Sequence, residues 1–174
     1  LESANRLLEE CREELRQEGA AFVENVPVGM MIETPASVLL AEEFAAQVDF
    51  FSIGTNDLTQ YVMAADRGSH ELRALCDPFQ PAVLRAIRTV IEAGHAHGIP
   101  VGMCGEFAAN AQAQPLLLEL GLDEFSMAAS SLPETKLALR KLRTEDARKC
   151  AEELLQCSSR GEVAQKLEQQ TAAI

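Results

Sequence analysis

Apolar residues recur in this chain as short continuous runs that alternate with longer stripes of helical period. Four runs have the length and composition of β-strands, at about residues 26–32, 49–53, 100–103 and 124–127. Each run ends in polar or small residues and is followed by a helical pattern. This alternation predicts four successive βα units with parallel strands, whose carboxyl ends all lie at one edge of a sheet.

Start and stop signals define the expected helices. Residues 3–17 carry an amphipathic stripe that Gly19 ends, and the clearest stripe begins at Pro81. Thr34 and Pro35 predict an N-cap and a first-turn proline for the helix after the first strand. The other expected helices are residues 111–120, a helix to about Leu142 that Ser131 and Glu134 open as a capping box, residues 144–156, and a last helix capped by Ser159 and Glu162.

The strand–helix order predicts an α/β fold, the C-terminal half of a (β/α)8 barrel of the TIM type. A complete barrel has eight such units and about 250 residues, whereas this chain has 174 residues. A doubly wound sheet is the competing fold. Polar residues at several strand ends favour the barrel, because its catalytic groups come from the ends of different strands. We expect a half barrel over residues 1–143 and a helical extension over residues 144–174.

Composition disfavours several classes of protein. The formal net charge of -12 and the isoelectric point near 4.7 argue against binding to nucleic acid or to an anionic membrane surface. No apolar run approaches the roughly 20 residues of a membrane span, and residues 1–20 do not resemble a signal peptide. The five cysteines are odd in number and lack CxxC spacing, which favours reduced thiols in a cytoplasmic protein.

The second strand carries the densest cluster of candidate site residues. The run from Asp49 to Gln60 stops being apolar at a glycine and then presents Asn56 and Asp57. Glu33 follows the first strand and Cys104 ends the third. Because the carboxyl ends of parallel strands meet at one edge, we expect these side chains to converge. Residues chosen only for turn geometry are the alternative interpretation of Asn56 and Asp57.

The residue types indicate a site for phosphate and magnesium. Glu33 and Asp57 are hard oxygen ligands, of the kind that hold Mg²⁺ together with water and substrate oxygens. Asn56 can donate to a phosphate oxygen, and Arg67 can bind a phosphate through two N–H groups. Helix capping and dipole compensation are the alternative roles for the two carboxylates. A plain surface cation is the alternative for Arg67, which lies in a long connection over residues 61–81.

Cys104 is a candidate proton donor. An ordinary thiol keeps its proton at neutral pH, so Cys104 can act as an acid, with Glu106 capping or orienting it. A packed small hydrophobic residue is the alternative. Three histidines, His70, His95 and His97, are weak candidates for any role, and the last two lie at a helix end where the dipole favours a cation.

These residues lie in motifs that resemble those of the phosphoenolpyruvate-utilising enzymes. The resemblance rests first on the run from Asp49 to Gln60, continued to Arg67. Within that family, the branch that is similar is Enzyme I, the phosphoenolpyruvate-protein phosphotransferases of bacterial sugar phosphotransferase systems. The motifs that carry this second similarity are Gly29–Ala36, Asp77–Arg85, Gly102–Glu106 and Gly121–Met127.

The resemblance implies a dimeric barrel domain that binds phosphoenolpyruvate and Mg²⁺. In the family, the phosphoryl group passes to a histidine on a separate domain and then to a small phosphocarrier protein that serves sugar transport. The remaining enolate is protonated to pyruvate. By matching position, Glu33 and Asp57 would bind the metal. Asn56, Asp57 and Arg67 would bind the substrate, and Cys104 would supply the proton.

The chain departs from the family pattern in two respects. The residues from Arg67 to His70 do not reproduce the glycine-rich motif of the phosphorylated histidine, and the arginines of the earlier barrel strands have no counterpart. We therefore expect a piece of a longer chain that is inactive alone and self-associates through unpaired strand edges. The alternatives are a domain of the pyruvate phosphate dikinase or phosphoenolpyruvate synthase type and a non-catalytic dimerisation module.

Overall fold

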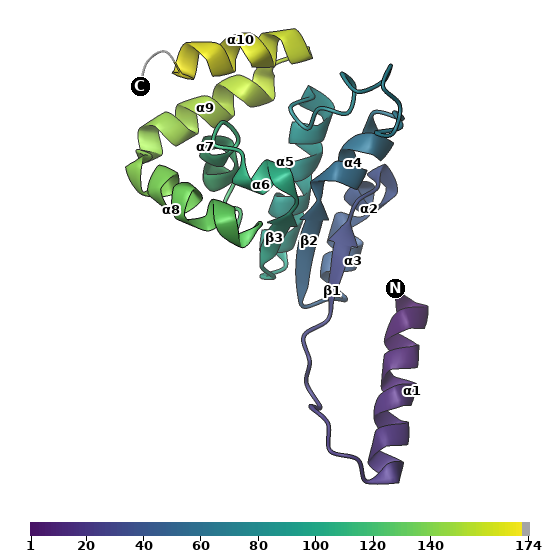
Figure 1. The fold of residues 1–174 in the computed structure, drawn as a ribbon. Coiled ribbons are helices and arrows are strands. Elements are labelled where there is room, and N and C mark those ends of the chain that lie inside the picture. The colour runs from purple at the N-terminus through teal and green to yellow at the C-terminus, as the bar shows by residue number, and fades with distance from the viewer. Residues whose placement is uncertain (172–174) are drawn as a thin grey trace.

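A sheet of four parallel strands forms the centre of the computed structural model, which describes residues 1–171 (Figure 1). The strands follow one another across the sheet in the order β1-β2-β3-β4. Their bounds are Gly29–Ile32 for β1, Phe50–Gly54 for β2, Val101–Cys104 for β3 and Glu124–Ser126 for β4. Every neighbouring pair is parallel, so the predicted succession of parallel βα units is confirmed.

Helices connect the strands and extend the chain at both ends. None of the helices within residues 1–171 is long and apolar enough to cross a membrane. Their bounds are α1 Glu2–Glu18, α2 Pro35–Leu39, α3 Ala41–Ala45, α4 Thr55–Val62, α5 Pro81–Ala96, α6 Glu106–Ala109, α7 Gln114–Glu119, the 3-10 turn η1 Ala129–Ser131, α8 Leu132–Lys141, α9 Thr144–Gln156 and α10 Arg160–Thr171.

One face of the sheet is covered by helices, α5 above all. Phe51, Ile53, Val101 and Met103 are fully buried in the core that this face shares with α5. A Cβ on Gly94 of α5 would overlap the Val101 side chain. The glycine therefore lets the helix approach β3 closely, which explains why the apolar stripe continues through it.

The opposite face of the sheet is open. Met31 and Phe50 on this face are 43% and 37% exposed. The strand register aligns Met31 with Ser52, Gly102 and Glu124 in one row across it. Parallel sheets are normally covered on both faces. Within the described residues, helices cover only one face of this sheet.

Helix α1 stands apart from the sheet (Figure 1). The predicted helix is confirmed, and Gly19 ends it in a left-handed conformation with φ of 68°. None of its residues is buried, and Leu7 on the apolar stripe is 57% exposed. Arg16 holds the segment that follows, because its guanidinium binds the Glu24 carboxylate at 2.7 Å. The apolar stripe of α1 thus has no cover within residues 1–171.

The C-terminal helices pack against the far side of the helical layer. α9 lies on α7 and buries Ala147, Cys150 and Leu154. Cys150 and Leu154 belong to the same core as the strands. Burial raises the pKa of the Cys150 thiol to about 11, so this cysteine stays protonated. The boundary proposed at residue 144 stays a prediction, and the packing shows that α9 shares the central core.

Two capping predictions are confirmed. The Thr34 hydroxyl accepts from the amide of Ser37 at 3.2 Å, and Pro35 opens α2. At α10 the Ser159 hydroxyl accepts from the amide of Glu162 at 3.2 Å, while the Glu162 carboxylate accepts from the Ser158 amide at 2.7 Å. Local hydrogen bonds therefore set both starts as the sequence predicted.

Other local predictions are wrong. The Ser131 side chain makes no capping bond, because η1 already gives Ser131 a helical backbone with φ of -87° and ψ of -16°. The first strand begins at Gly29, three residues after the predicted start at about residue 26. The amide of Val28 donates to the Asp49 carboxylate rather than to a backbone carbonyl of a neighbouring strand. The helix predicted over residues 111–120 is shorter, as α7 spans Gln114–Glu119.

Candidate functional site

The carboxyl ends of β1, β2 and β3 form the edge at which the predicted site residues lie. Ile32 pairs with Ile53, so Glu33 follows in the row of Gly54, which pairs with Cys104. Glu33 lies directly over Gly54. A Cβ on that glycine would overlap the Glu33 carboxylate. Glu33 makes no hydrogen bond or ion pair to any of residues 1–171, which leaves both carboxylate oxygens available to a ligand.

Asn56 and Asp57 lie in the first turn of α4 rather than in an open turn. Gly54 is the N-cap, and no side chain in the described part of the chain caps this helix start. The capping interpretation of Asp57 is therefore not supported by a hydrogen bond, although its charge does face the positive end of the helix dipole. Asp57 contacts Arg67 instead, with Oδ1 3.6 Å from Nη2. Both side chains are well exposed, so this pair is weak and open to exchange for a ligand.

Helix α4 also fixes the backbone of Arg67. The Gln60 side-chain oxygen accepts a hydrogen bond from the Arg67 amide at 3.2 Å. Gln60 lies one turn after Asp57, so one face of α4 contacts both the guanidinium and the main chain of Arg67. Next to it, the Asp66 carboxylate accepts from the Gly68 amide at 2.7 Å and closes a tight turn. Sequence reasoning missed Gln60, whose only signal was its spacing of three residues from Asp57.

Cys104 is half-buried at the end of β3, beside the start of α4. Its thiol contacts the Ile53 carbonyl at 3.7 Å, and its own carbonyl accepts from the buried Thr55 hydroxyl at 3.3 Å. The next residue, Gly105, has φ of 110°, which favours glycine. A Cβ at Gly105 would lie 3.0 Å from the Thr55 hydroxyl and 3.8 Å from Asn56 Nδ2. The Cys104 segment and the Asn56 segment are thus in close contact.

The remaining candidates lie elsewhere or make other contacts. Glu106 is exposed at the start of α6 and makes no hydrogen bond to Cys104. His95 binds Asp123 through Nε2 at 2.9 Å, and the same Asp123 oxygen accepts from the Val101 amide at 2.8 Å. Partial burial alone would raise the pKa of Asp123. The bonds from Val101 and His95 outweigh it and hold that pKa below its usual value of 3.8.

The side chains of His70 and His97 are not bonded to any of the candidate site residues. His97 caps the C-terminal end of α5, and His70 lies in the connection after Arg67. Neither side chain forms a hydrogen bond or an ion pair with a described residue, and the His97 amide donates to the carbonyls of Ala93 and Gly94 at the helix end. The structure therefore brings Glu33, Asn56, Asp57, Arg67 and Cys104 to one edge, whereas His95 is bound to Asp123 just before the start of β4.

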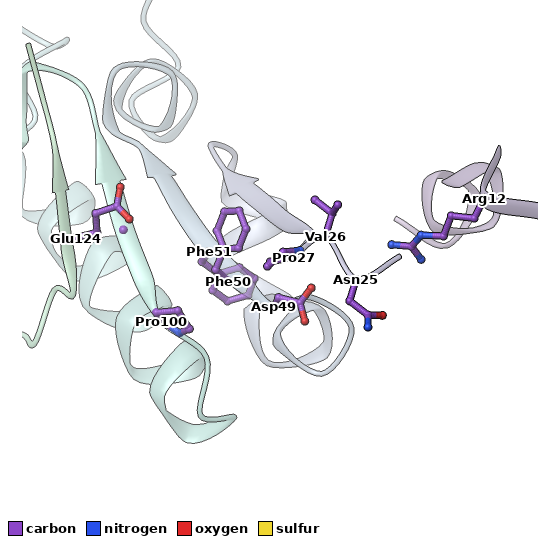
Figure 2. A pocket seen from close by; sticks show the side chains of 10 residues that line it. Arg12, Asn25, Val26, Pro27, Asp49, Phe50, Phe51, Pro100 and Glu124 are labelled. Carbon is purple, nitrogen blue, oxygen red and sulfur yellow. The ribbon is translucent and has the colours of Figure 1, made fainter. Parts of the chain in front are cut away.

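A cavity of about 640 Å³ opens at the opposite end of the strands (Figure 2). Asp49, Phe50 and Pro100 line it near the amino ends of β2 and β3, and Glu124 lines it at the start of β4. Arg12 lines it from α1. In open parallel sheets ligands bind outside the carboxyl ends of the strands. This cavity is therefore a feature of the open face and separate from the site edge.

The donor set at the site edge fits a divalent cation only in part. No group of three or more acidic, histidine or cysteine side chains among residues 1–171 could enclose a metal ion. Mg²⁺ usually retains several waters and binds one or two carboxylates together with substrate phosphates. The unpartnered Glu33 carboxylate and the exposed Asp57 carboxylate fit that mode of binding. They do not fit a closed structural metal site.

Comparisons with known proteins identify relatives. A family model described as PEP-utilising enzyme, PEP-binding domain, matches residues 1–144. The chain is 47% identical over 168 residues to a phosphoenolpyruvate-protein phosphotransferase of Staphylococcus carnosus, and 48% identical over 162 residues to one of Streptococcus equinus. These alignments cover 97% and 92% of this chain but 29% and 28% of the relatives. The chain thus spans less than a third of their length.

A solved structure provides a fold comparison. A citrate lyase from Burkholderia xenovorans matches 98% of this chain and 60% of its own, with a TM-score of 0.55 and 17% sequence identity. At that identity the similarity concerns the fold alone. It agrees with the α/β arrangement around a parallel sheet.

Proposed function

The chain belongs to the PEP-utilising enzymes through their PEP-binding domain, and we propose that it binds phosphoenolpyruvate and Mg²⁺ within a phosphoenolpyruvate-protein phosphotransferase. The observation that carries this proposal is the common edge shared by an unpartnered carboxylate, an amide, a second carboxylate and an arginine. The residues are Glu33, Asn56, Asp57 and Arg67. Phosphoryl transfer depends mainly on positioning and charge neutralisation, which these groups can supply.

Each residue has a role that its chemistry supports. Glu33 and Asp57 would hold Mg²⁺, and Asn56 and Arg67 would bind the phosphate oxygens of the substrate. The metal, when bound, neutralises charge on the phosphoryl group. Gln60 keeps the Arg67 backbone against α4, so the guanidinium reaches the site from a fixed position. Asp57 holds Arg67 in the free protein through the exposed 3.6 Å pair, which a phosphate can displace.

Cys104 would complete the reaction as the proton donor. When the phosphoryl group leaves for a histidine on another domain, the C–O bond of the substrate remains and an enolate is left. The enolate carbon takes the proton of the Cys104 thiol and becomes the methyl group of pyruvate, while the thiolate recovers a proton from water. The phosphohistidine then passes its phosphoryl group to a small phosphocarrier protein. Contact of the Cys104–Gly105 segment with Asn56 supports this role, because it keeps the thiol near the substrate groups.

The arrangement of the strands supports half of a (β/α)8 barrel. A doubly wound sheet reverses its strand order at a switch point. The order β1-β2-β3-β4 continues without reversal. The open face, with Met31 and Phe50 exposed, would become the barrel interior when four more strands close it. We accordingly propose that this chain alone does not turn over substrate and that the complete protein is a cytoplasmic homodimer.

Binding of Mn²⁺ in place of Mg²⁺ tests the proposal. Electron paramagnetic resonance titration of the 174-residue chain should show Mn²⁺ binding that phosphoenolpyruvate strengthens. Asp57→Asn should weaken that binding about tenfold or more by removing one carboxylate charge. Asp146→Asn is the matched control, because Asp146 lies exposed in the first turn of α9. If the Mn²⁺ affinity changes neither with phosphoenolpyruvate nor in Asp57→Asn, and the chain dimerises, the result would instead favour an assembly module.

A further inference from the structure

Arg160 occupies an unfavourable position for an arginine. It is the first residue of α10, where the helix dipole disfavours a cation. Its side chain is nevertheless only 32% exposed and reaches a residue 83 positions earlier in the chain. Nε donates to Oδ2 of Asp77, and the guanidinium carbon lies 5.5 Å from the centre of the Phe79 ring. A residue placed against its local preference indicates that tertiary contacts decide its position.

Asp77 belongs to the turn at the end of the segment between α4 and α5, residues 63–80, which contains Arg67 and is called the Arg67 connection below. Its Oδ1 accepts from the amide of Phe79 at 2.9 Å, which leaves Oδ2 for Arg160. Asp77 is 29% exposed, so the ion pair is partly shielded from water. Arg160 therefore holds the end of the connection whose beginning is held on α4 by the bond between Gln60 and Arg67.

Phe79 continues the contact toward Cys104. Its ring packs edge-to-face on Phe107, with ring centres 4.9 Å apart and planes at 75°. Both rings are buried, at 5% and 3% exposure. Phe107 is the second residue of α6 and lies three positions after Cys104. A continuous set of contacts thus joins α10 to the segment that carries the candidate proton donor.

A second arginine fixes the segment from which α10 starts. Arg85 of α5 donates to the carbonyl of Leu155 at 3.3 Å and to that of Cys157 at 3.0 Å. α5 begins just after the Asp77 turn. The end of α9 and the turn that Arg160 binds are therefore both attached to the start of one helix, which gives Arg160 a fixed base.

We infer that Arg160 is a positioning residue, which holds the Arg67 connection and the Cys104 segment in fixed relation to each other. The roles of Arg67 and Cys104 rest on the proposed function, whereas the contacts of Arg160 do not. Arg160 lies beyond residues 1–144, which the family model matches. Its Nη1 is buried without a hydrogen-bond partner among the described residues, a cost that the ion pair and the ring contact must offset.

The cysteines of the chain can report on this contact. Cys76 adjoins Asp77, and Cys104 ends β3, whereas Cys11 is exposed on α1 and Cys150 is buried on α9. We would compare their alkylation rates with iodoacetamide in the 174-residue chain and in Arg160→Gln, resolved by peptide mass spectrometry well below the melting temperature. Without Arg160, local opening should raise the rates at Cys76 and Cys104 about fivefold. The rates at Cys11 and Cys150 should not change.

Matched variants separate positioning from general stability. Arg148→Gln is the control, because Arg148 is 66% exposed and its only ion pair within residues 1–171 is with Glu152 on the same helix. Arg160→Lys keeps the charge opposite Asp77 but loses the planar group over Phe79, so it should protect Cys76 better than Cys104. Asp77→Asn retains an acceptor for the Phe79 amide and removes the ion pair, so it should raise the alkylation rates of both Cys76 and Cys104. It replaces Arg160→Gln in the test if that variant does not fold.

Two outcomes would overturn the inference. One is unchanged alkylation of Cys76 and Cys104 in Arg160→Gln and Asp77→Asn. The other is an equal rise at every cysteine, including Cys150, since that pattern indicates global destabilisation rather than local opening. The rates are measured without phosphoenolpyruvate or metal. The positioning role and the proposed function can therefore fail independently.

Discussion

Replacing Gly54 with alanine should weaken metal binding while leaving the fold intact. Gly54 has φ of -88° and ψ of 88°, so the backbone can accept a side chain. The new methyl group would lie 2.9 Å from Glu33 Cδ and closer still to two other atoms of that side chain. A side-chain Cβ does not approach non-bonded atoms this closely, so the Glu33 carboxylate must rotate away from the strand end.

The size of the effect follows from the charge that is moved. Displacing a unit charge from about 3 Å to about 6 Å from a divalent ion costs about 1.4 kcal/mol even at the dielectric constant of water, a factor of about 10 in affinity. A less polar site would lose more. The free energy of unfolding should change by less than about 1 kcal/mol, because alanine also reduces the freedom of the unfolded chain.

Two measurements on the same variant check this reasoning. Mn²⁺ titration gives the affinity, and a thermal or urea transition gives the stability. Gly161→Ala is the control, since a Cβ there meets no atom closer than 3.9 Å. Unchanged Mn²⁺ affinity in Gly54→Ala, beside a clear loss in Glu33→Gln, would refute the placement of Glu33 over Gly54. A loss of more than about 3 kcal/mol in stability would refute the view that only Glu33 must move.

Two further predictions concern Cys104 and Asp123. In the complete phosphotransferase, Cys104→Ser should keep at least part of the histidine phosphorylation and lose pyruvate formation, because a hydroxyl is a much poorer proton donor than a thiol. Both steps are followed on one sample, and equal loss of both with a lower melting temperature would contradict the acid role. At the other end of the sheet, the lowered pKa of Asp123 stabilises the fold at pH values above its usual 3.8, and this contribution disappears as pH falls through the native pKa. The stability difference between the wild type and Asp123→Asn, from urea unfolding, should therefore be present near neutral pH and shrink below about pH 4; a difference that is independent of pH would exclude the charge of Asp123 as its source.

The sequence predicted the elements whose signals are local. The strand-to-helix alternation, the end of α1 at Gly19 and the starts at Pro35 and Pro81 each depend on a few neighbouring residues. The same holds for the cap at Ser159. Because parallel strands share one carboxyl edge, the order of these elements was also enough to bring Glu33 and Cys104 to the same edge of the sheet, on either side of the end of β2.

Local signals failed where a neighbouring element competed for the same residues. Ser131 and Glu134 have the spacing of a capping box, but a 3-10 turn before α8 gives Ser131 the backbone of a helix interior. Val28 reads as strand, yet its amide bonds to the Asp49 side chain. In both places the local backbone conformation decides which hydrogen bonds form, and residue types alone do not specify that conformation.

Only the tertiary structure decided which distant residues meet. The sequence gives no sign that Arg160 binds Asp77 across 83 residues, or that Gln60 accepts from the Arg67 amide. It also did not show that one face of the sheet is open, because Met31 and Phe50 look like core residues in any strand. Hydrophobic period and capping act over about one helical turn. A contact between separate elements depends on how the chain brings them together, and the conformation of a single segment does not encode that path.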